Sequence, residues 1–138
     1  MNWLHWALLS ALFAGLTAVL AKVGVKNVDS NLATAIRTFV ILIFAWSIAW
    51  RQETVTLASV SPRSWLCLVL SGIATGASWL CYFRALQLGK ASQVAPIDKL
   101  SVVVAMVLAA VFLGEDLNWR HWAAGALIVS GAILLARA

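Results

Sequence analysis

The segment Trp3–Ala21, WLHWALLSALFAGLTAVLA, contains no Asp, Glu, Lys or Arg. An apolar helix of about 20 residues is long enough to cross the hydrocarbon core of a bilayer. No basic region precedes this segment and no A-x-A cleavage pattern follows it, so we expect it to remain as a membrane span and not to act as a cleaved signal peptide. The first part of the chain therefore predicts a transmembrane helix.

Four further apolar segments follow, separated by short polar connections. Hydrophobic residues make up 63% of the chain and charged residues 11%, whereas soluble domains are about half apolar and a quarter charged. A chain this short could not bury so much apolar surface in water. We therefore expect an all-α membrane protein, a single domain over residues 1–138 built as a bundle of five transmembrane helices. The expected spans are Trp3–Ala21, Asn31–Trp50, Ser64–Phe83, Gln93–Leu113 and Trp119–Ala136.

Local signals support this division. Ser61 followed by Pro62 is typical of an N-cap and a first helical residue. An odd number of spans places the two termini on opposite sides of the membrane.

Small residues spaced by four, as in Gly72-x-x-x-Gly76, favour close packing of helices. Ala11 with Gly15, and Gly125 with Gly131, suggest the same close packing. Seven tryptophans should form an interfacial belt on the side of the N-terminus: Trp3, Trp6, Trp46, Trp50, Trp65, Trp119 and Trp122.

The net charge of +5 does not indicate nucleic-acid binding, because the cations occur singly at the ends of apolar segments and form no basic stripe. Such cations anchor helices at lipid headgroups. Five lie on the side opposite the N-terminus and three on the side of the N-terminus, which makes the former side cytoplasmic by the positive-inside rule. The difference is small enough to permit both orientations. The two sets are Lys22, Lys26, Arg84, Lys90 and Arg137, and Arg51, Arg63 and Arg120.

Three ionisable residues stand out inside the expected spans: Arg37, Asp98 and Lys99. Charged groups within the bilayer are costly and are functional candidates by default. Arg37 and Asp98 each follow the start of their span by a similar number of residues, so both should lie roughly 8–9 Å deep at 1.5 Å per residue. We predict that Asp98 is an ion-pair partner of Arg37 or Lys99 and stays ionised, because the surrounding cations outweigh its desolvation.

Each candidate also has a purely structural alternative. Pro96 could be the first residue of the fourth helix, which would make Asp98 a first-turn acid favoured by the helix dipole. Arg37 and Lys99 could be anchors that extend to the headgroups. Lys22 and Arg84 lie near the same surface. Trp79 and Tyr82, with Phe83, could form an aromatic wall toward a substrate or pack as interfacial rings.

Chemistry of other kinds has little support in the sequence. Cys67 and Cys81 fall in one expected helix, roughly 21 Å apart, so they cannot form a disulfide with each other. His5 and His121 lie in the tryptophan belt, and no residues have the spacing of a catalytic or metal-binding group. We therefore expect neither an enzyme nor a bound cofactor or metal.

Several motifs resemble the EamA domain of the drug/metabolite transporter superfamily, and the resemblance covers essentially the whole chain. The motifs are Ala21–Lys26, Ala35–Thr38, Tyr82–Gly89, Ala95–Ser101, the Leu113-Gly114-Glu115 that ends the fourth apolar span, and Gly125–Gly131. The Gly114-Glu115 pair is the most specific of them.

The resemblance implies a five-helix half-transporter. Larger relatives carry two such units in inverted orientation and move amino acids, other metabolites or drugs. The first span lacks the acidic residue with which small four-helix multidrug exporters bind protons, so export of aromatic cations is not expected. We expect a small-molecule substrate, a bacterial plasma (inner) membrane location, and an antiparallel homodimer or a heterodimer with another half-transporter. The alternative is a membrane subunit that modulates a partner protein and transports nothing.

Overall fold

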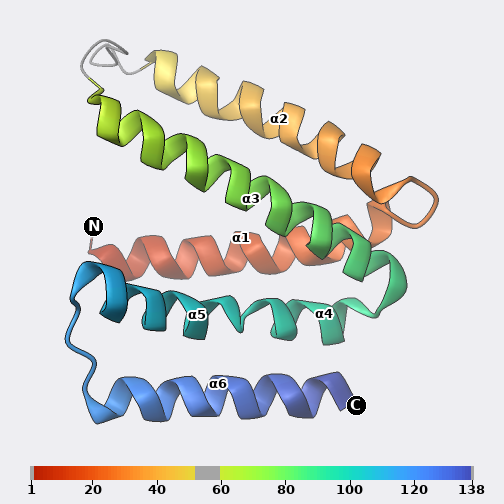
Figure 1. Ribbon diagram of the computed structural model, residues 1–138. Helices are drawn as coiled ribbons and strands as arrows, with labels where there is room; N and C mark the ends of the chain where they lie inside the picture. The colour runs from red at the N-terminus through yellow and green to blue at the C-terminus, as the bar shows by residue number, and fades with distance from the viewer. Residues whose placement is uncertain (1, 52–59, 138) are drawn as a thin grey trace. The chain divides into compact units, whose positions relative to one another are not determined.

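The computed structural model describes residues 2–51 and 60–137, and this part of the chain is helical without strands (Figure 1). Of the expected connection over residues 51–63, residues 52–59 lie outside the described part. The elements in chain order are α1 (Trp3–Gly24), α2 (Ser30–Arg51), α3 (Pro62–Leu88), α4 (Ala91–Asp98), α5 (Ser101–Leu108), the π-helix η2 (Ala109–Leu113) and α6 (Trp119–Arg137).

Five of the described helical segments are long and apolar enough to cross a membrane, which confirms the expected fold class. Large apolar side chains are mostly exposed along them, including Leu12, Phe44 and Leu127 at 67%, 65% and 74%. Exposed apolar surface of this extent is unstable in water and suits a lipid environment. The five spans are Trp3–Gly24, Ser30–Arg51, Pro62–Leu88, Ala91–Leu113 and Trp119–Arg137.

The starts of three helices are fixed by side-chain caps that satisfy their free backbone N–H groups. The Ser61 hydroxyl accepts a bond from the Ser64 N–H at 3.1 Å, and α3 begins at Pro62, which confirms the expected cap. Two caps were not anticipated: Asp29 accepts bonds from the first turn of α2, and Asn118 from the first turn of α6.

The third span is longer than expected. It continues to Leu88, so the connection to the next helix is only Gly89–Lys90 and not residues 84–92. Arg84 therefore lies on a helix and not in a loop.

The fourth span is interrupted. Pro96 lies inside α4, where it has no backbone N–H to donate, and the helix stops at Asp98 before α5 starts at Ser101. Around the break the Lys99 N–H bonds to the Pro96 oxygen and the Leu100 N–H to the Ile97 oxygen, an i→i+3 pattern. The continuous helix expected over residues 93–113 is thus two helices and a terminal π-turn.

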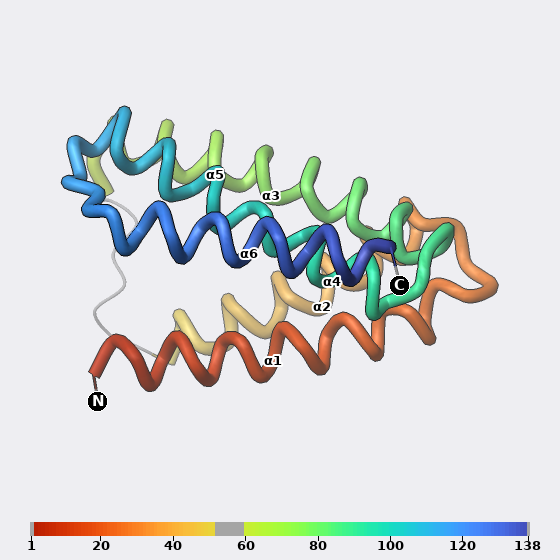
Figure 2. The backbone as a smooth tube through the Cα atoms, turned by 90° about the horizontal axis from the view of Figure 1, so that it is seen from below, coloured from red at the N-terminus to blue at the C-terminus, as the bar shows by residue number. Residues whose placement is uncertain are grey.

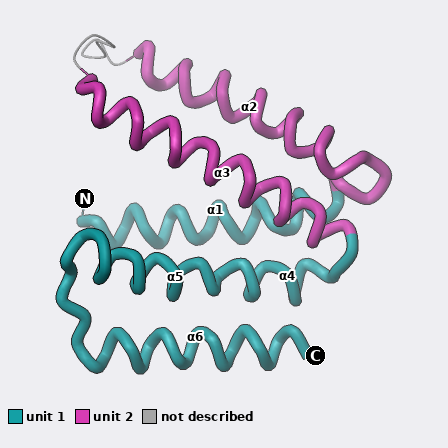
Figure 3. Tube along the Cα trace, in the orientation of Figure 1, with its two compact units in different colours: residues 1–23, 88–138 teal, residues 24–87 magenta. Residues whose placement is uncertain are grey.

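The described chain forms two compact units (Figure 3). Unit 1 consists of residues 1–23 and 88–138, and it contains α1, α4, α5, η2 and α6. In it, α4 and α5 pack against α6, and Gly125 lies where an added Cβ would be 3.8 Å from Met106 and 3.9 Å from Val103. Helix α1 begins at one end of unit 1 and α6 ends at the other (Figures 1 and 2), as expected for an odd number of spans.

Unit 2 consists of residues 24–87 and contains α2 and α3. Its buried side chains gather near the α1–α2 connection and the end of α3: Val25, Ser30, Thr34, Phe83 and Leu86. The Gln87 amide donates to the Val28 carbonyl at 2.7 Å, which holds the end of α3 to that connection.

Only some of the small-residue motifs expected to pack closely against another helix do so in the structure. An added Cβ at Gly15, Gly72, Gly76 or Gly131 would meet nothing within 4 Å, in contrast to Gly125. The expected packing at Gly72-x-x-x-Gly76 is therefore not formed among the described residues.

The seven belt tryptophans are exposed and lie within about two turns of a helix end, as interfacial anchoring requires.

Candidate functional site

Among the described charged residues of unit 2, Arg37 lies farthest from the ends of its helix. It follows the start of α2 at Ser30 by seven residues, about 10 Å along the axis. Its guanidinium carbon lies 4.5 Å from the centroid of the Trp79 ring and 5.5 Å from that of Phe83. Trp79 and Phe83 are four residues apart on α3, so they lie on one face of that helix. Two aromatic rings thus hold one cation between α2 and α3.

This aromatic setting leaves the guanidinium without an anionic partner in the described structure. The salt bridge found there joins Lys99 and Asp98 and does not involve Arg37. A cation over an aromatic ring gains about 0.5–2 kcal/mol, more as it is desolvated. A planar guanidinium also carries N–H donors in a fork that matches the two oxygens of a carboxylate or phosphate. Arg37 is therefore oriented and charged but not neutralised.

The neighbouring polar groups of unit 2 have structural partners. Tyr82 packs edge-to-face on Phe83, with centroids 6.4 Å apart and an interplanar angle of 67°. Arg84 is exposed and donates from Nη1 to the Gln87 Oε1 at 3.0 Å, and Gln87 in turn bonds to the α1–α2 connection. Arg84 thus helps to fix the last turn of α3, which follows Phe83.

In unit 1 the candidate residues lie at the two ends of α4, with Lys22 beside its start and Asp98 and Lys99 at its end. The Lys22 amine, in the last turn of α1, donates to the Gly89 carbonyl at 2.7 Å and so ties α1 to the short α3–α4 connection. Lys99 Nζ lies 3.6 Å from Asp98 Oδ2, with the two side chains 57% and 36% exposed. An ion pair this exposed contributes little to stability. Asp98 is the last residue of α4 and Pro96 lies inside that helix, so the first-turn alternative for Asp98 is wrong.

The candidates thus fall into two groups. Arg37, Trp79, Tyr82 and Arg84 belong to unit 2, whereas Lys22, Asp98 and Lys99 belong to unit 1. From the sequence, Phe83 was expected to belong to an aromatic wall or to interfacial ring packing, and Gln87 was not predicted as a site residue. The four-residue spacing of Trp79 and Phe83 was the signal that both rings face the same neighbour. Gln87 follows Phe83 by four residues too, but nothing in the sequence indicated its partner, which is distant in the chain.

Five apolar spans in the described part of the chain define a multi-pass integral membrane protein. The chain belongs to the EamA-like transporter family, whose family model matches residues 1–137. The resemblance noted in the sequence is thereby confirmed.

A curated relative supports the same assignment. The chain is 54% identical over 136 residues to a Sinorhizobium sp protein named "Uncharacterized transporter in cobO 3'region", and the match covers 98% of this chain and 96% of the relative. No solved structure gives a significant match.

Proposed function

We propose that this protein is a secondary transporter unit that moves a small polar metabolite with an anionic group, and that Arg37 binds this group. The observation that supports the proposal is the Arg37 guanidinium, held between Trp79 and Phe83 within a span and without an acidic partner among the described residues. Charged groups at this depth are costly and are kept where they bind or transfer something.

The surrounding charge favours the same class of substrate. The chain has ten Lys and Arg against five Asp and Glu, and in the described spans Asp98 is the acid and it has a lysine beside it. A cationic substrate would meet surplus positive charge, whereas an anionic or zwitterionic one would neutralise Arg37. The aromatic rings beside Arg37 are less polar than water, and a lower local dielectric strengthens such an attraction. Trp79 and Tyr82 contribute the apolar wall, and Lys22, Arg84, Asp98 and Lys99 are further candidates for polar contacts.

We further propose that two five-helix units work together in antiparallel orientation. Secondary transporters commonly build a midplane site from two inverted repeats that alternate access. The described part of residues 1–138 contains five spans, the number in one such repeat. The second unit is a copy of this chain or another half-transporter. The family model runs across units 1 and 2, which supports our proposal that both belong to one transport domain. We propose a bacterial plasma membrane as its location.

Ligand-dependent thermal stabilisation of the purified protein tests the substrate class. A bound ligand stabilises the folded state by mass action, so a panel of anionic, zwitterionic and cationic metabolites should raise the melting temperature only for members that carry a carboxylate or phosphate. Arg37→Gln should abolish the shift, since a lost charge-assisted pair costs at least tenfold in affinity, about 1.4 kcal/mol.

Arg51→Gln is the matched control, because Arg51 is the last residue of α2 and lies at the edge of its span. It should bind and transport as the unsubstituted protein does. Equal behaviour of the two variants in stabilisation and in proteoliposome uptake would remove Arg37 from the site. Stabilisation by cationic metabolites alone would contradict the proposed substrate class.

A further inference from the structure

The two aromatic rings beside Arg37 belong to a stripe on α3 that also includes Gln87. Trp79, Phe83 and Gln87 follow one another in steps of four residues, so they lie on one face of the helix. The two rings meet the Arg37 guanidinium at 4.5 and 5.5 Å. About one turn further along, the Gln87 amide donates to the Val28 carbonyl at 2.7 Å. One face of α3 thus makes both the aromatic contact with α2 and a hydrogen bond to the connection that leads into α2.

Both ends of the Gln87 amide have a partner of the matching kind. A backbone carbonyl only accepts hydrogen bonds, and a guanidinium only donates them. The Val28 carbonyl accepts from Gln87 Nε2, and Arg84 Nη1 donates to Gln87 Oε1 at 3.0 Å. The bond from Arg84 therefore fixes which way the amide is turned and directs its N–H donor toward Val28.

The position of α3 along α2 depends on contacts in the second half of α3. Residues 62–75 of that helix are exposed, whereas Phe83 and Leu86 are buried. Apolar contacts are non-directional and permit helices to slide, but a hydrogen bond weakens steeply when its geometry is lost. The Phe83 ring, at 5.5 Å, is near the roughly 6 Å limit of a cation–π contact. A small displacement of α3 would therefore weaken its hold on Arg37.

We propose that Gln87 is a positioning residue, which through its bond to Val28 holds Trp79 and Phe83 against the Arg37 guanidinium. It acts through the two rings and not by contact with a bound anion. This inference rests on the proposed function, in which Arg37 binds the anionic group of the substrate. A cation that is already oriented loses less conformational freedom on binding, so loss of the Gln87 bond should weaken anion binding although Arg37 keeps its charge.

Fluorine NMR of the full chain labelled with 5-fluorotryptophan tests the positioning role without any ligand. Trp79→Phe identifies the Trp79 signal among those of the eight tryptophans, and Arg37→Gln gives its position without the cation. Gln87→Met, which keeps the length of the side chain but has no N–H donor, should move the Trp79 signal toward the Arg37→Gln position. Gln93→Met, the same change on α4 in unit 1, is the matched control and should leave it in place.

A purely structural role for Gln87 would lower the melting temperature but leave the Trp79 signal of the folded protein unchanged. An unchanged signal in Gln87→Met therefore overturns the proposal. Gln87→Glu decides the question if Gln87→Met does not fold. The introduced carboxylate still accepts from Arg84 but cannot donate to the Val28 carbonyl, so the Trp79 signal should move here too. A signal that stays in place in Gln87→Glu equally overturns the proposal.

Titration with inorganic phosphate distinguishes this proposal from the proposed function. Phosphate should shift the Trp79 signal of the unsubstituted protein, and Gln87→Met should need about five-fold more phosphate for half of the shift, the factor that corresponds to one net hydrogen bond. An equal phosphate requirement in the two proteins overturns the inferred effect on binding. A Trp79 signal that moves in Gln87→Met but responds to phosphate in neither protein supports the positioning role and contradicts the anion site at Arg37.

Discussion

At the scale of single residues, Gly114 of the family's Gly-Glu motif caps the end of the fourth span. It ends the π-turn with φ +68°, and the following Glu115 N–H bonds back to the Ala109 carbonyl at 3.3 Å. Glycine adopts this left-handed conformation without the steric cost that a Cβ imposes. The Gly-Glu pair recognised in the sequence thus terminates the fourth span.

Gly114→Ala should therefore lower the free energy of unfolding by roughly 1–2 kcal/mol, the cost of a Cβ in the left-handed region. Denaturation in a lipid–detergent mixture, followed by circular dichroism, would measure the loss. Gly15→Ala is the control, because Gly15 is an ordinary helical residue with free space around it, and it should be neutral or slightly stabilising. Equal losses in both variants would contradict the conformational explanation.

Asp98 gives a second prediction at this scale. Asp98→Asn should destabilise the protein by at most about 1 kcal/mol, since its observed partner Lys99 is an exposed neighbour. The sequence also predicted Arg37 as a partner, and in that case Arg37→Gln in the Asp98→Asn background should restore part of the stability. A double-mutant cycle for each pair separates the two partners.

The role of Asp98 in coupling is tested by the same variant. As an ion-pair partner that stays charged, it should leave the pH dependence of transport in place when replaced by Asn. A variant that folds normally but transports without pH dependence would identify Asp98 as a proton carrier instead.

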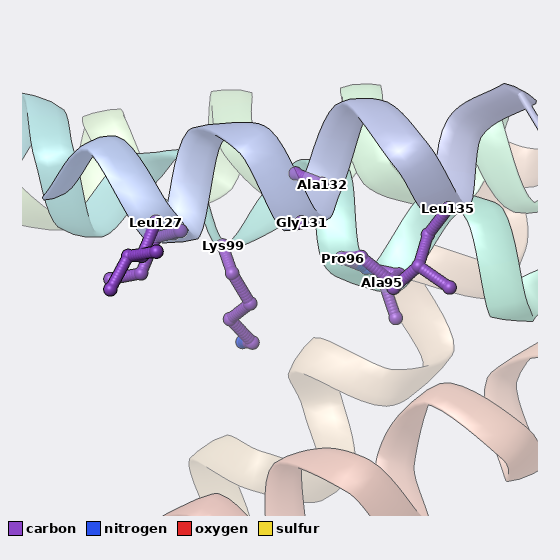
Figure 4. Close-up of a pocket in the computed structure, with 8 residues that line it drawn as sticks. Ala95, Pro96, Lys99, Leu127, Gly131, Ala132 and Leu135 are labelled. Carbon is purple, nitrogen blue, oxygen red and sulfur yellow. The ribbon is translucent and has the colours of Figure 1, made fainter. Parts of the chain in front are cut away.

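At the scale of elements, the fourth span is interrupted, whereas each of the other four spans is one continuous α-helix. Pro96 removes one helical N–H, and the chain tightens between Asp98 and Ser101 before it resumes as α5. Breaks of this kind in transporters lie where backbone groups approach a cavity. Here the break carries Asp98 and Lys99 and adjoins an open, mostly apolar groove of about 440 Å³ between α4 and α6, whose lining includes Pro96 and Lys99 (Figure 4).

Pro96→Ala should restore the missing N–H and straighten the span, with a gain in stability of less than about 3 kcal/mol, the cost of proline in a soluble helix interior. Amide hydrogen exchange at residues 95–101 should slow. Pro62→Ala is the matched control, because Pro62 is the first residue of α3 and makes no helix kink. Unchanged exchange in Pro96→Ala would show that proline does not cause the break.

At the scale of the whole molecule, the proposed antiparallel pair makes a prediction about orientation. Lysines added to residues 114–118 in one copy and to residues 25–29 in another should fix the copies in opposite orientations, because positive loops stay cytoplasmic. Uptake should then require both copies in the same cell. Full activity from either locked copy alone would contradict the pair, and reporters fused to both termini would verify the orientations.

The membrane class, the number of spans and the family were already determined by the sequence. These features depend on the composition of continuous segments, and hydrocarbon thickness converts segment length directly into a helix that crosses it. Ser61–Pro62 marked the start of α3 for the same reason, since a cap involves neighbours in the chain. The limits of α3 were less predictable, because Arg84 and Gln87 are polar and yet continue the helix.

The partners of the charged residues were decided only by tertiary structure. Nothing in the sequence distinguished an Arg37 that reaches for headgroups from one held by Trp79 and Phe83, because that contact joins helices far apart in the chain. The groove beside Lys99 likewise exists only because the flat face of α6 at Gly131 packs along α4. Helical periodicity shows which residues share a face, and packing determines what that face meets.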